Sequence, residues 1–390
     1  MELSFDFRLM RIAYLSPSFP PLLGGMGTAC YYTANEIGKN HQVTVFLAKR
    51  NVEYKKGNYK IKLIRPWLSY GHAHLMPQVL WLLKDFDIVH LYYPYFGTAE
   101  FLGLLKLIRG SKKPKVIFHH SMEAVGTGFL KYIFKFHTKF IMPILMKSVD
   151  AIFILSKDYA EHSDISKIYK KHPEKFYEAP HGVDVTKFKV KNEKLKVKEN
   201  NKIIFTAQAL DKQHFFKGID VLIKAFYILN TQYSIQNAKL MIAGDGDLKK
   251  YYQNLANKIG VQDKVIFLGK VSQEELPYYY NLATITVVPS TQRTECFSIA
   301  AVESMACATP VVVTDFPGVR VTIENNKSGL VAKPNDEKDL AEKLSFFLTS
   351  PEKAKDFGNN ARKRVEEKFN WQIITQKILM HYREILSLAK

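Results

Sequence analysis

Residues 289–318 read PSTQRTECFSIAAVESMACATPVVVTDFPG, and this stretch decides the fold. The apolar, β-branched run at 285–288 precedes it and predicts a buried parallel strand, which Pro289 ends. Good helix formers follow over 298–306, with Ser298 as the cap. The pattern strand, loop, helix is typical of an α/β protein with a parallel sheet.

Two carboxylates mark this segment as a candidate ligand site. Glu295 lies in the loop at the strand's carboxyl end, and Glu303 lies about one turn inside the helix. The free N–H groups of 297–299 favour an anion such as a pyrophosphate. A carboxylate one turn further on can accept hydrogen bonds from ribose hydroxyls, and the loop carboxylate from a second sugar. The stretch therefore indicates a nucleotide-sugar site, although two such glutamates taken alone are more often solvated surface charges.

The rest of the chain repeats the alternation of strands and helices. It predicts two Rossmann-like, doubly wound parallel-sheet domains facing across a cleft. We expect an N-terminal domain over 1–188, a second domain over 203–369 and a helix over 370–390. The strand-like runs are Arg11–Ser16, Val43–Phe46, Ile88–Leu91, Val116–His119 and Ala151–Leu155 before a charged stretch at 189–202, and Ile203–Ala207, Leu240–Ala243, Val265–Leu268, Ile285–Val288 and Val311–Thr314 after it.

Composition narrows the class of protein. The 390 residues, 47% hydrophobic, fit two domains. The three cysteines have neither zinc-site nor disulfide spacing, and we find no long apolar run and no leader, so we expect a cytoplasmic protein. A formal net charge of +19 implies attraction to an anionic partner, either nucleic acid, lipid head groups or a phosphorylated substrate.

Several loops carry weaker signals. Gly24 and Gly25 follow the first strand, where glycine lets the backbone approach a phosphate, although such turns often have no function. Lys217 precedes a helix and can add positive charge to a pyrophosphate. His214 is either a ligand contact or a packed loop residue, and Gly244 forms a tight turn that would keep the cleft floor open.

His119, His120 and Glu123 lie at the end of a first-domain strand. An imidazole there can meet a sugar hydroxyl or a phosphate, and a hydrogen-bonded structural histidine is the alternative. Because successive strand side chains point to opposite faces, we expect at most one of the two histidines to reach the cleft.

Taken together, these motifs resemble the family 4 retaining nucleotide-sugar glycosyltransferases of the GT-B fold. The resemblance covers nearly the whole chain, and it implies that the domain over 1–188 binds the acceptor, that the domain over 203–369 binds the nucleotide-sugar donor and that the helix over 370–390 packs back on the first domain. It rests on Gly24-Gly25, Asp87-Ile88-Val89-His90, Phe118-His119-His120, Pro180-His181-Gly182-Val183-Asp184, Lys217-Gly218, Gly244-Asp245-Gly246, and Glu295 to Glu303 followed by Thr309-Pro310-Val311-Val312.

The resemblance implies roles for these residues. Glu303 would hold the donor ribose, Glu295 and the following amides the sugar and phosphates, and Lys217 the pyrophosphate. Gly25 would let the first domain close over the phosphates, and His120, or His119 if the register differs, would contact the transferred sugar. The predicted catalytic residues are His120, Lys217 and Glu295; the donor-binding residues are Gly24, Gly25, Lys217, Gly244, Glu295, Cys296, Phe297, Ser298, Ile299 and Glu303; and further candidates are His119, Glu123 and His214.

The sequence departs from the family pattern at three places. Gln208-Ala209-Leu210 replaces the usual Gly-Arg-Leu, so charge neutralisation would fall more on Lys217. Ser298 and Ala308 replace glycines, and the side chain of Ser298 could narrow the phosphate site.

The resemblance also implies transfer of a hexose from a UDP- or GDP-linked sugar with retention, no cofactor and no required metal. The acceptor would be a glycan or a lipid-linked molecule. Lysines interleaved with apolar residues over 103–115 and 129–146 predict contact with an anionic membrane surface, and ordinary core helices with solvated lysines are the alternative.

Two other functions compete with this one. A nucleotide-sugar epimerase of the same fold would need no acceptor. A non-enzymatic nucleic-acid-binding protein would explain the charge, but the basic residues are scattered and form no recognised module, so we expect no nucleic-acid partner.

If the chain has the GT-B fold, we expect backbone groups near residues 269–272 to recognise the base of the donor.

Overall fold

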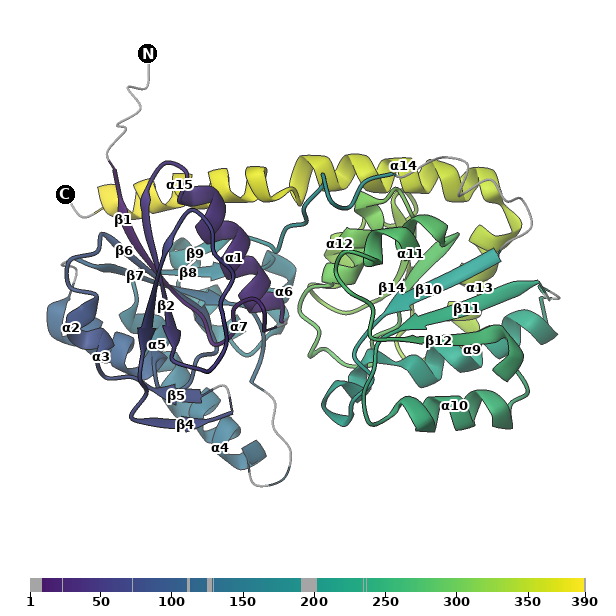
Figure 1. The fold of residues 1–390 in the computed structure, drawn as a ribbon, viewed down its shortest axis with the longest axis horizontal. Helices are drawn as coiled ribbons and strands as arrows, with labels where there is room; N and C mark the ends of the chain where they lie inside the picture. Colours follow the sequence, from purple (N-terminus) through teal and green to yellow (C-terminus); the bar gives the residue numbers. More distant parts are fainter. Residues whose placement is uncertain are drawn as a thin grey trace, which may run out of the picture. The chain divides into compact units, whose positions relative to one another are not determined.

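The computed structural model describes residues 9–22, 24–71, 73–110, 113–124, 128, 130–190, 202–233, 235 and 237–388. These form two compact units (Figure 1): one consists of residues up to His181 together with Trp371 onward, and the other of Gly182–Asn370. The observed boundary precedes the predicted one after residue 188. The segment after His181 already belongs to the second unit, since the Val183 N–H donates to the Phe369 carbonyl over 2.8 Å. Most of the charged stretch predicted as a connection, 191–201, lies outside the described residues.

The first unit is built on a parallel sheet with strand order β3-β2-β1-β6-β7-β8-β9. The chain winds outward in both directions from the neighbouring pair β1 and β6. The strands are β1 (Arg11–Leu15), β2 (Gln42–Ala48), β3 (Lys60–Ile64), β6 (Ile88–Tyr93), β7 (Lys115–His120), β8 (Ala151–Ile154) and β9 (Phe176–Glu178), and a separate antiparallel hairpin pairs β4 (Leu68–Tyr70) with β5 (Ala73–Leu75).

Helices cover both faces of this sheet. Helices α1 and α15 supply the buried side chains of one core, and α2, α3, α5, α6 and α7 supply those of the other. The bounds are α1 (Gly25–Ile37), α2 (Val79–Leu82), α3 (Ala99–Arg109), α4 (Leu130–Phe136), the π-helical turn η1 (His137–Ile141), α5 (Met142–Ser148), α6 (Lys157–His162), α7 (Ser166–Lys171), a 3₁₀ turn η2 (Pro173–Lys175) and α15 (Trp371–Ser387).

A buried chain of polar groups joins the last helix to this sheet. His119 Nε2 donates to the carbonyl of Ala179 over 3.0 Å, which leaves His119 Nδ1 to accept from His90 Nε2 at 3.2 Å. His90 Nδ1 then accepts from the Tyr382 hydroxyl at 2.6 Å, and Tyr14 donates to Tyr382 at 2.8 Å. Burial lowers the pKa of His90 to about 3, so this imidazole is neutral. Each group of the hydrogen-bonded series therefore donates to the next in the same direction.

The second unit has a parallel sheet in the order β12-β11-β10-β13-β14-β15. Helices α9, α10 and α13 pack on one face of it, and α11, α12 and α14 pack together on the other (Figure 1). The strands are β10 (Lys202–Ala207), β11 (Ala238–Ala243), β12 (Val265–Gly269), β13 (Ile285–Val288), β14 (Val311–Thr314) and β15 (Gly329–Ala332), and the helices are α9 (Ile219–Thr231), α10 (Lys249–Lys258), α11 (Leu276–Leu282), α12 (Ile299–Ala306), α13 (Glu337–Thr349) and α14 (Pro351–Lys368), with 3₁₀ turns η3 (Lys212–Lys217), η4 (Gln262–Lys264) and η5 (Arg320–Thr322).

Both sheets therefore have the doubly wound, parallel α/β architecture that the sequence predicted. Their carboxyl ends carry the loops that follow each strand, and ligands of such sheets bind where the winding reverses. In the second unit this point lies between β10 and β13. In the part of the chain that the structure describes, no helix combines the length and apolar character needed to cross a bilayer.

Candidate functional site

The loops after β10 and β13 are fastened to each other at the reversal point of the second sheet. Gly218 has φ +70°, and a Cβ there would overlap the carbonyl oxygen of Pro289. The N–H of Thr291 donates to the carbonyl of Phe216 over 2.7 Å. Because of these contacts, side chains from two distant stretches of sequence meet at the carboxyl ends of the neighbouring strands β10 and β13.

Lys217 and Glu295 form an ion pair there, with 2.7 Å between Lys217 Nζ and Glu295 Oε1. The Ser290 hydroxyl donates to the other carboxylate oxygen. The lysine side chain is 17% exposed and the glutamate side chain 6%. Because little water screens this pair, its electrostatic interactions are stronger than those of a solvated pair. Two of the predicted catalytic residues are thus in direct contact.

Helix α12 begins immediately after this pair. Ser298 is its N-cap, as predicted, and its Oγ accepts from the Ala301 N–H at 3.2 Å. The hydroxyl is therefore engaged with its own helix. Phe297 is buried, with its ring centroid 5.7 Å from that of Phe369, and Cys296 is buried beside it in sequence. These buried side chains hold the backbone in place just before Ile299, the first residue of α12.

Glu303 is buried one turn further along α12 and accepts a hydrogen bond from the Tyr280 hydroxyl at 3.0 Å. Burial raises the pKa of Glu303 to about 7, although the Tyr280 hydrogen bond and the charge of Lys187 act in the opposite direction. Among the described residues Tyr280 is its one hydrogen-bond partner, so the carboxyl group retains acceptor positions for a ligand's hydroxyls.

Further loops lie at the same carboxyl end of the second sheet. A Cβ at Gly244, where φ is +145°, would overlap the carbonyl oxygen of Gln208, and the Gly244 N–H donates to the carbonyl of Gly269 over 2.7 Å. The predicted base-recognition segment starting at Gly269 is therefore held beside the loop after β11. His214 Nδ1 lies 2.8 Å from Asp211 Oδ1. Burial opposes ionisation of Asp211, but this hydrogen bond and the charge of His214 lower its pKa, and the pair stabilises the turn before Lys217.

In the first unit, Gly24 precedes helix α1 and Gly25 is its first residue. His119 and His120 point to opposite faces of β7, as expected for consecutive strand residues. Both ring nitrogens of His119 are engaged in the polar chain described above, and burial, together with His90 and His181, lowers its pKa well below the usual value. His119 is therefore a neutral structural residue.

His120 is also fully buried, and it packs against Tyr93 and Tyr159 with centroids 5.7 and 5.8 Å away. Its Nε2 lies 3.0 Å from Asp164 Oδ1. Glu123 also contacts Asp164, since its Oε1 accepts from the Asp164 N–H at 3.0 Å. Asp164, in the loop between α6 and α7, thus contacts both His120 and Glu123, and Glu123 helps to position it.

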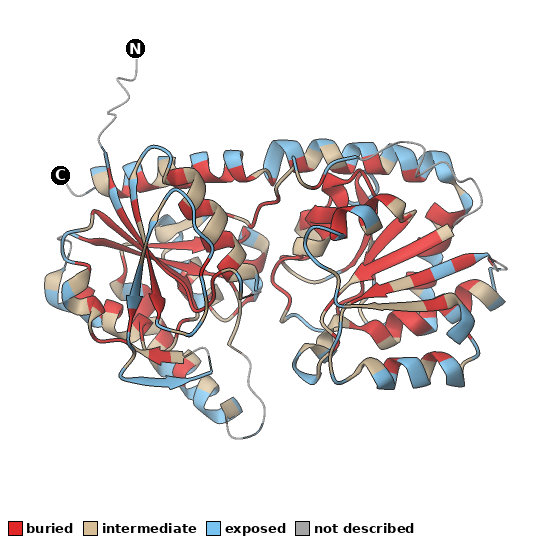
Figure 2. Ribbon diagram, in the orientation of Figure 1, coloured by how far each residue is buried: buried red, intermediate tan, exposed pale blue. Residues whose placement is uncertain are grey.

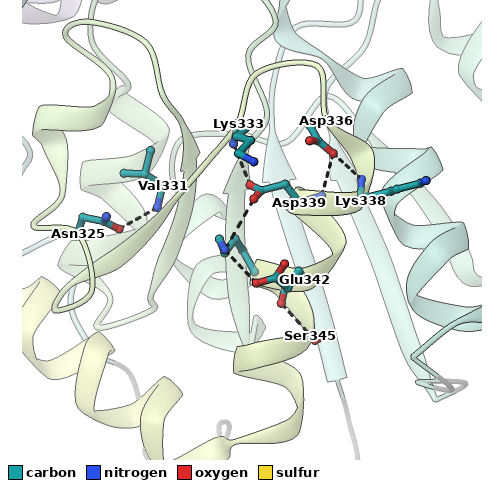
Figure 3. A network of polar contacts seen from close by, with 9 residues as sticks. Asn325, Val331, Lys333, Asp336, Lys338, Asp339, Glu342 and Ser345 are labelled. Atoms are coloured by element: carbon teal, nitrogen blue, oxygen red, sulfur yellow. Dashed lines mark hydrogen bonds and ion pairs between the residues drawn. The ribbon is translucent and has the colours of Figure 1, made fainter.

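A groove of about 630 Å³ lies elsewhere in the second unit, along the outer edge of β15. Figure 3 shows that side chains cap this edge: Asn325 Oδ1 accepts from the Val331 N–H at 3.1 Å, and Asp339 Oδ2 from the Lys333 N–H at 2.9 Å. None of the predicted site residues lines this groove. Capped N–H groups cannot pair with another strand, so the sheet ends here.

Comparison with known proteins assigns the family. The profile described as Glycosyltransferase Family 4 matches residues 23–187, and the profile described as Glycosyl transferases group 1 matches residues 187–364. The chain belongs to the family 4 glycosyltransferases. This glycosyltransferase has the GT-B fold, with two parallel-sheet α/β units.

Individual relatives of this glycosyltransferase are distant. An uncharacterized glycosyltransferase of Methanocaldococcus jannaschii is 26% identical over 401 residues, which cover 96% of this chain and 98% of the relative. A GDP-mannose-dependent phosphatidylinositol monomannoside mannosyltransferase of Mycobacterium tuberculosis is 28% identical over 167 residues, covering 42% of this chain and 43% of that protein. The crystal structure of Anabaena HepE with UDP has a TM-score of 0.75 at 16% identity, covering 96% of this chain and 100% of the other.

Sequence reasoning did not single out three residues of this glycosyltransferase that support the candidate site. Tyr280 donates to Glu303, Ser290 donates to Glu295, and Asp164 faces His120. Ser290 had a local signal, since it is a polar residue directly after a strand. The other two had none, because their partners are brought to them only by the packing of distant segments.

Proposed function

We propose that this enzyme transfers a hexose from a nucleotide-diphosphate sugar, linked to UDP or GDP, to a glycan or lipid-linked acceptor with retention at the anomeric carbon. The observation that carries the proposal is the pairing of Lys217 with Glu295 at the reversal point of the second sheet, directly before helix α12. An ammonium, a helix start and a buried carboxyl at Glu303 together suit a pyrophosphate flanked by two sugars.

The reaction step follows from this arrangement. The acceptor hydroxyl attacks the anomeric carbon on the face from which the diphosphate leaves, the bond from that carbon to the phosphate oxygen breaks, and the departing phosphate takes the hydroxyl proton. Lys217 and the N–H groups at the start of α12 stabilise the negative charge that develops on the leaving group. Glu295 holds Lys217 in place before the donor binds and accepts hydrogen bonds from hydroxyls of the transferred sugar afterwards.

Relatives leave the donor's base open, since one is named for GDP-mannose and another was solved with UDP. Gln208 stands where the family usually has arginine, so the neutralisation of the pyrophosphate rests on Lys217 and helix α12. We propose no metal and no cofactor. The contact of His120 with the transferred sugar stays a prediction, because the imidazole is buried at the end of β7.

A binding panel tests the donor site. Calorimetry with UDP, GDP and ADP and with their glucose, mannose, galactose and N-acetylglucosamine derivatives should identify one nucleotide that binds this protein. Glu303→Ala should weaken that binding, whereas Glu352→Ala, an exposed change at the start of α14, should leave it unchanged. Absence of binding across the whole panel would contradict the donor-site assignment.

A further inference from the structure

Large apolar side chains that face solvent are concentrated in the first unit. More than half of the exposed large apolar residues in the described part of the chain lie between residues 63 and 144. Figure 2 shows exposed residues along β4 and α4. Isolated exposed apolar residues are ordinary, but a contiguous group of them marks an interaction site. We define the docking face by Trp67, Leu68 and Tyr70 of the hairpin segment and Tyr132, Phe136 and Phe140 of the α4–η1 segment.

The α4–η1–α5 segment presents one side of itself to solvent. Tyr132, Phe136, Phe140 and Ile144 recur every four residues and are between 51% and 69% exposed. A four-residue step advances about 40° around an α-helix. The π-helical turn η1 winds more widely and offsets that advance, so the four side chains stay on one side. The result is an apolar stripe that no element of the first unit covers within the described residues.

The hairpin is joined to this stripe through a short bridge. His74 of β5 donates its N–H to the carbonyl of Phe96 over 3.0 Å, and Phe96 stacks on Phe134 of α4 with centroids 5.0 Å apart. His137 of η1 lies 2.9 Å from Glu100 of α3, which fixes the same segment from its other side. The hairpin and α4 are therefore neighbours in the first unit, with Phe96 between them.

Lysines flank the stripe. Lys131, Lys135, Lys139 and Lys147 are exposed, and none of them forms an ion pair with a described residue. A lysine beside exposed aromatic rings can extend its alkyl chain along them and keep its ammonium at a polar interface. These charges are thus available to an anionic partner.

Three lysines of the other predicted basic segment, 103–115, are already paired with carboxylates. Lys106 and Lys115 are buried and lie 2.7 and 3.2 Å from Asp150, and Lys113 pairs with Asp87 at 2.6 Å. The prediction of a basic membrane surface over this segment is wrong for Lys106 and Lys115, because both are buried beside Asp150. Lys113 remains half-exposed and is paired with Asp87. Lys112 lies outside the described residues.

We infer that the docking face binds an anionic lipid bilayer, with its aromatic side chains in the boundary between head groups and acyl chains and the four lysines among the phosphates. Aromatic side chains flanked by lysines suit that boundary, where an apolar phase meets anionic phosphates. A soluble acidic partner would match the lysines but leave the protruding rings in water. The inference rests on the proposed function only in its lipid-linked acceptor, whose sugar-accepting end would be presented by the membrane to which the enzyme is bound.

Sedimentation with vesicles tests this inference. The full chain should bind vesicles of phosphatidylcholine with phosphatidylglycerol and bind much less to phosphatidylcholine alone. Phe136→Glu/Phe140→Glu should lower the partition coefficient by at least about tenfold on both kinds of vesicle. A triple change of Lys131, Lys135 and Lys139 to Ser should lower it by about a hundredfold on the anionic vesicles and hardly at all on the neutral ones.

The matched control is Tyr227→Glu/Tyr251→Glu, since these rings are similarly exposed but lie in the second unit. It should bind vesicles like the wild type. The inference is overturned if the wild type ignores anionic vesicles, if the control loses binding as much as the Phe136/Phe140 variant, or if ultracentrifugation shows that the face instead joins two copies, so that wild type is dimeric and the variant monomeric. Nucleotide binding measured on the same preparations separates the two proposals: intact donor binding without vesicle binding refutes only the docking face, and vesicle binding without donor binding refutes only the proposed function.

Discussion

Replacing Glu303 by Gln tests whether the second unit retains a buried charge at the expense of its own stability. Burial raises the pKa of this carboxyl group from its ordinary value of 4.5 to about 7. Between these two values the folded protein still holds a proton that the unfolded chain has released, so the free energy of unfolding falls as the pH rises. The gap corresponds to about 3 kcal/mol once the pH exceeds the folded-state value.

Glutamine has nearly the same size and keeps an oxygen that can accept from Tyr280, but it carries no charge. We expect Glu303→Gln to match the wild type at acidic pH, below about 4.5, and to be more stable by about 3 kcal/mol above pH 7. Urea denaturation followed by far-UV circular dichroism measures this. Tryptophan fluorescence would not serve, because Trp67, Trp81 and Trp371 all belong to the first unit.

If Glu303 accepts hydrogen bonds from the ribose hydroxyls, as proposed, the same variant should bind the nucleotide about tenfold more weakly, since an amide replaces a charged acceptor. Titrating groups shared by both proteins cancel in the comparison of the two stability curves. An equal pH dependence of wild type and variant would refute the reasoning about the buried charge. A lost pH dependence with unchanged nucleotide binding would refute the ribose role alone.

Three further changes probe other parts of the molecule. Lys217→Ala should reduce kcat/KM by about a hundredfold or more, because Glu295 cannot replace its positive charge; steady-state kinetics with donor and acceptor would contradict this if turnover were unchanged. Gly218→Ala should lower the stability of the second unit by more than about 1 kcal/mol, since the new methyl group overlaps the Pro289 carbonyl at a positive φ; an unaltered thermal midpoint would disprove the close approach of the two loops. Tyr382→Phe removes the hydroxyl at the centre of the buried polar chain and should cost about 1–3 kcal/mol in the first unit, and tryptophan-detected denaturation indistinguishable from wild type would show that the chain contributes nothing.

The central strands could be predicted from the sequence, whereas three edge strands and the two strands of the β4–β5 hairpin could not. Strands such as β10 and β13 are buried on both faces, so their sequences are continuous apolar runs. The unpredicted strands β3, β9 and β15 each lie at an end of a sheet. Edge strands need less apolar sequence: β3 alternates lysine with aliphatic residues, and β9 has only three residues.

The candidate site was predictable where its residues are close in sequence. Ser298 as a cap and Glu303 one turn into the helix follow from local patterns. The contact between Lys217 and Glu295 does not, since 78 positions separate them and only the order of the strands brings their loops together. Nor could sequence show that Glu123 and His120 both contact Asp164, because that requires the packing of the loop between α6 and α7.

The membership of helix α15 in the first unit makes that unit discontinuous along the chain. During synthesis, everything up to His181 leaves the ribosome long before the segment with Tyr382 does, and the apolar surface that α15 covers stays open through the translation of the whole second unit. The second unit, by contrast, is a continuous insert whose ends are joined by the pairing of Val183 with Asn370. It can therefore fold first, and helix α15, which is made after it, completes the first unit.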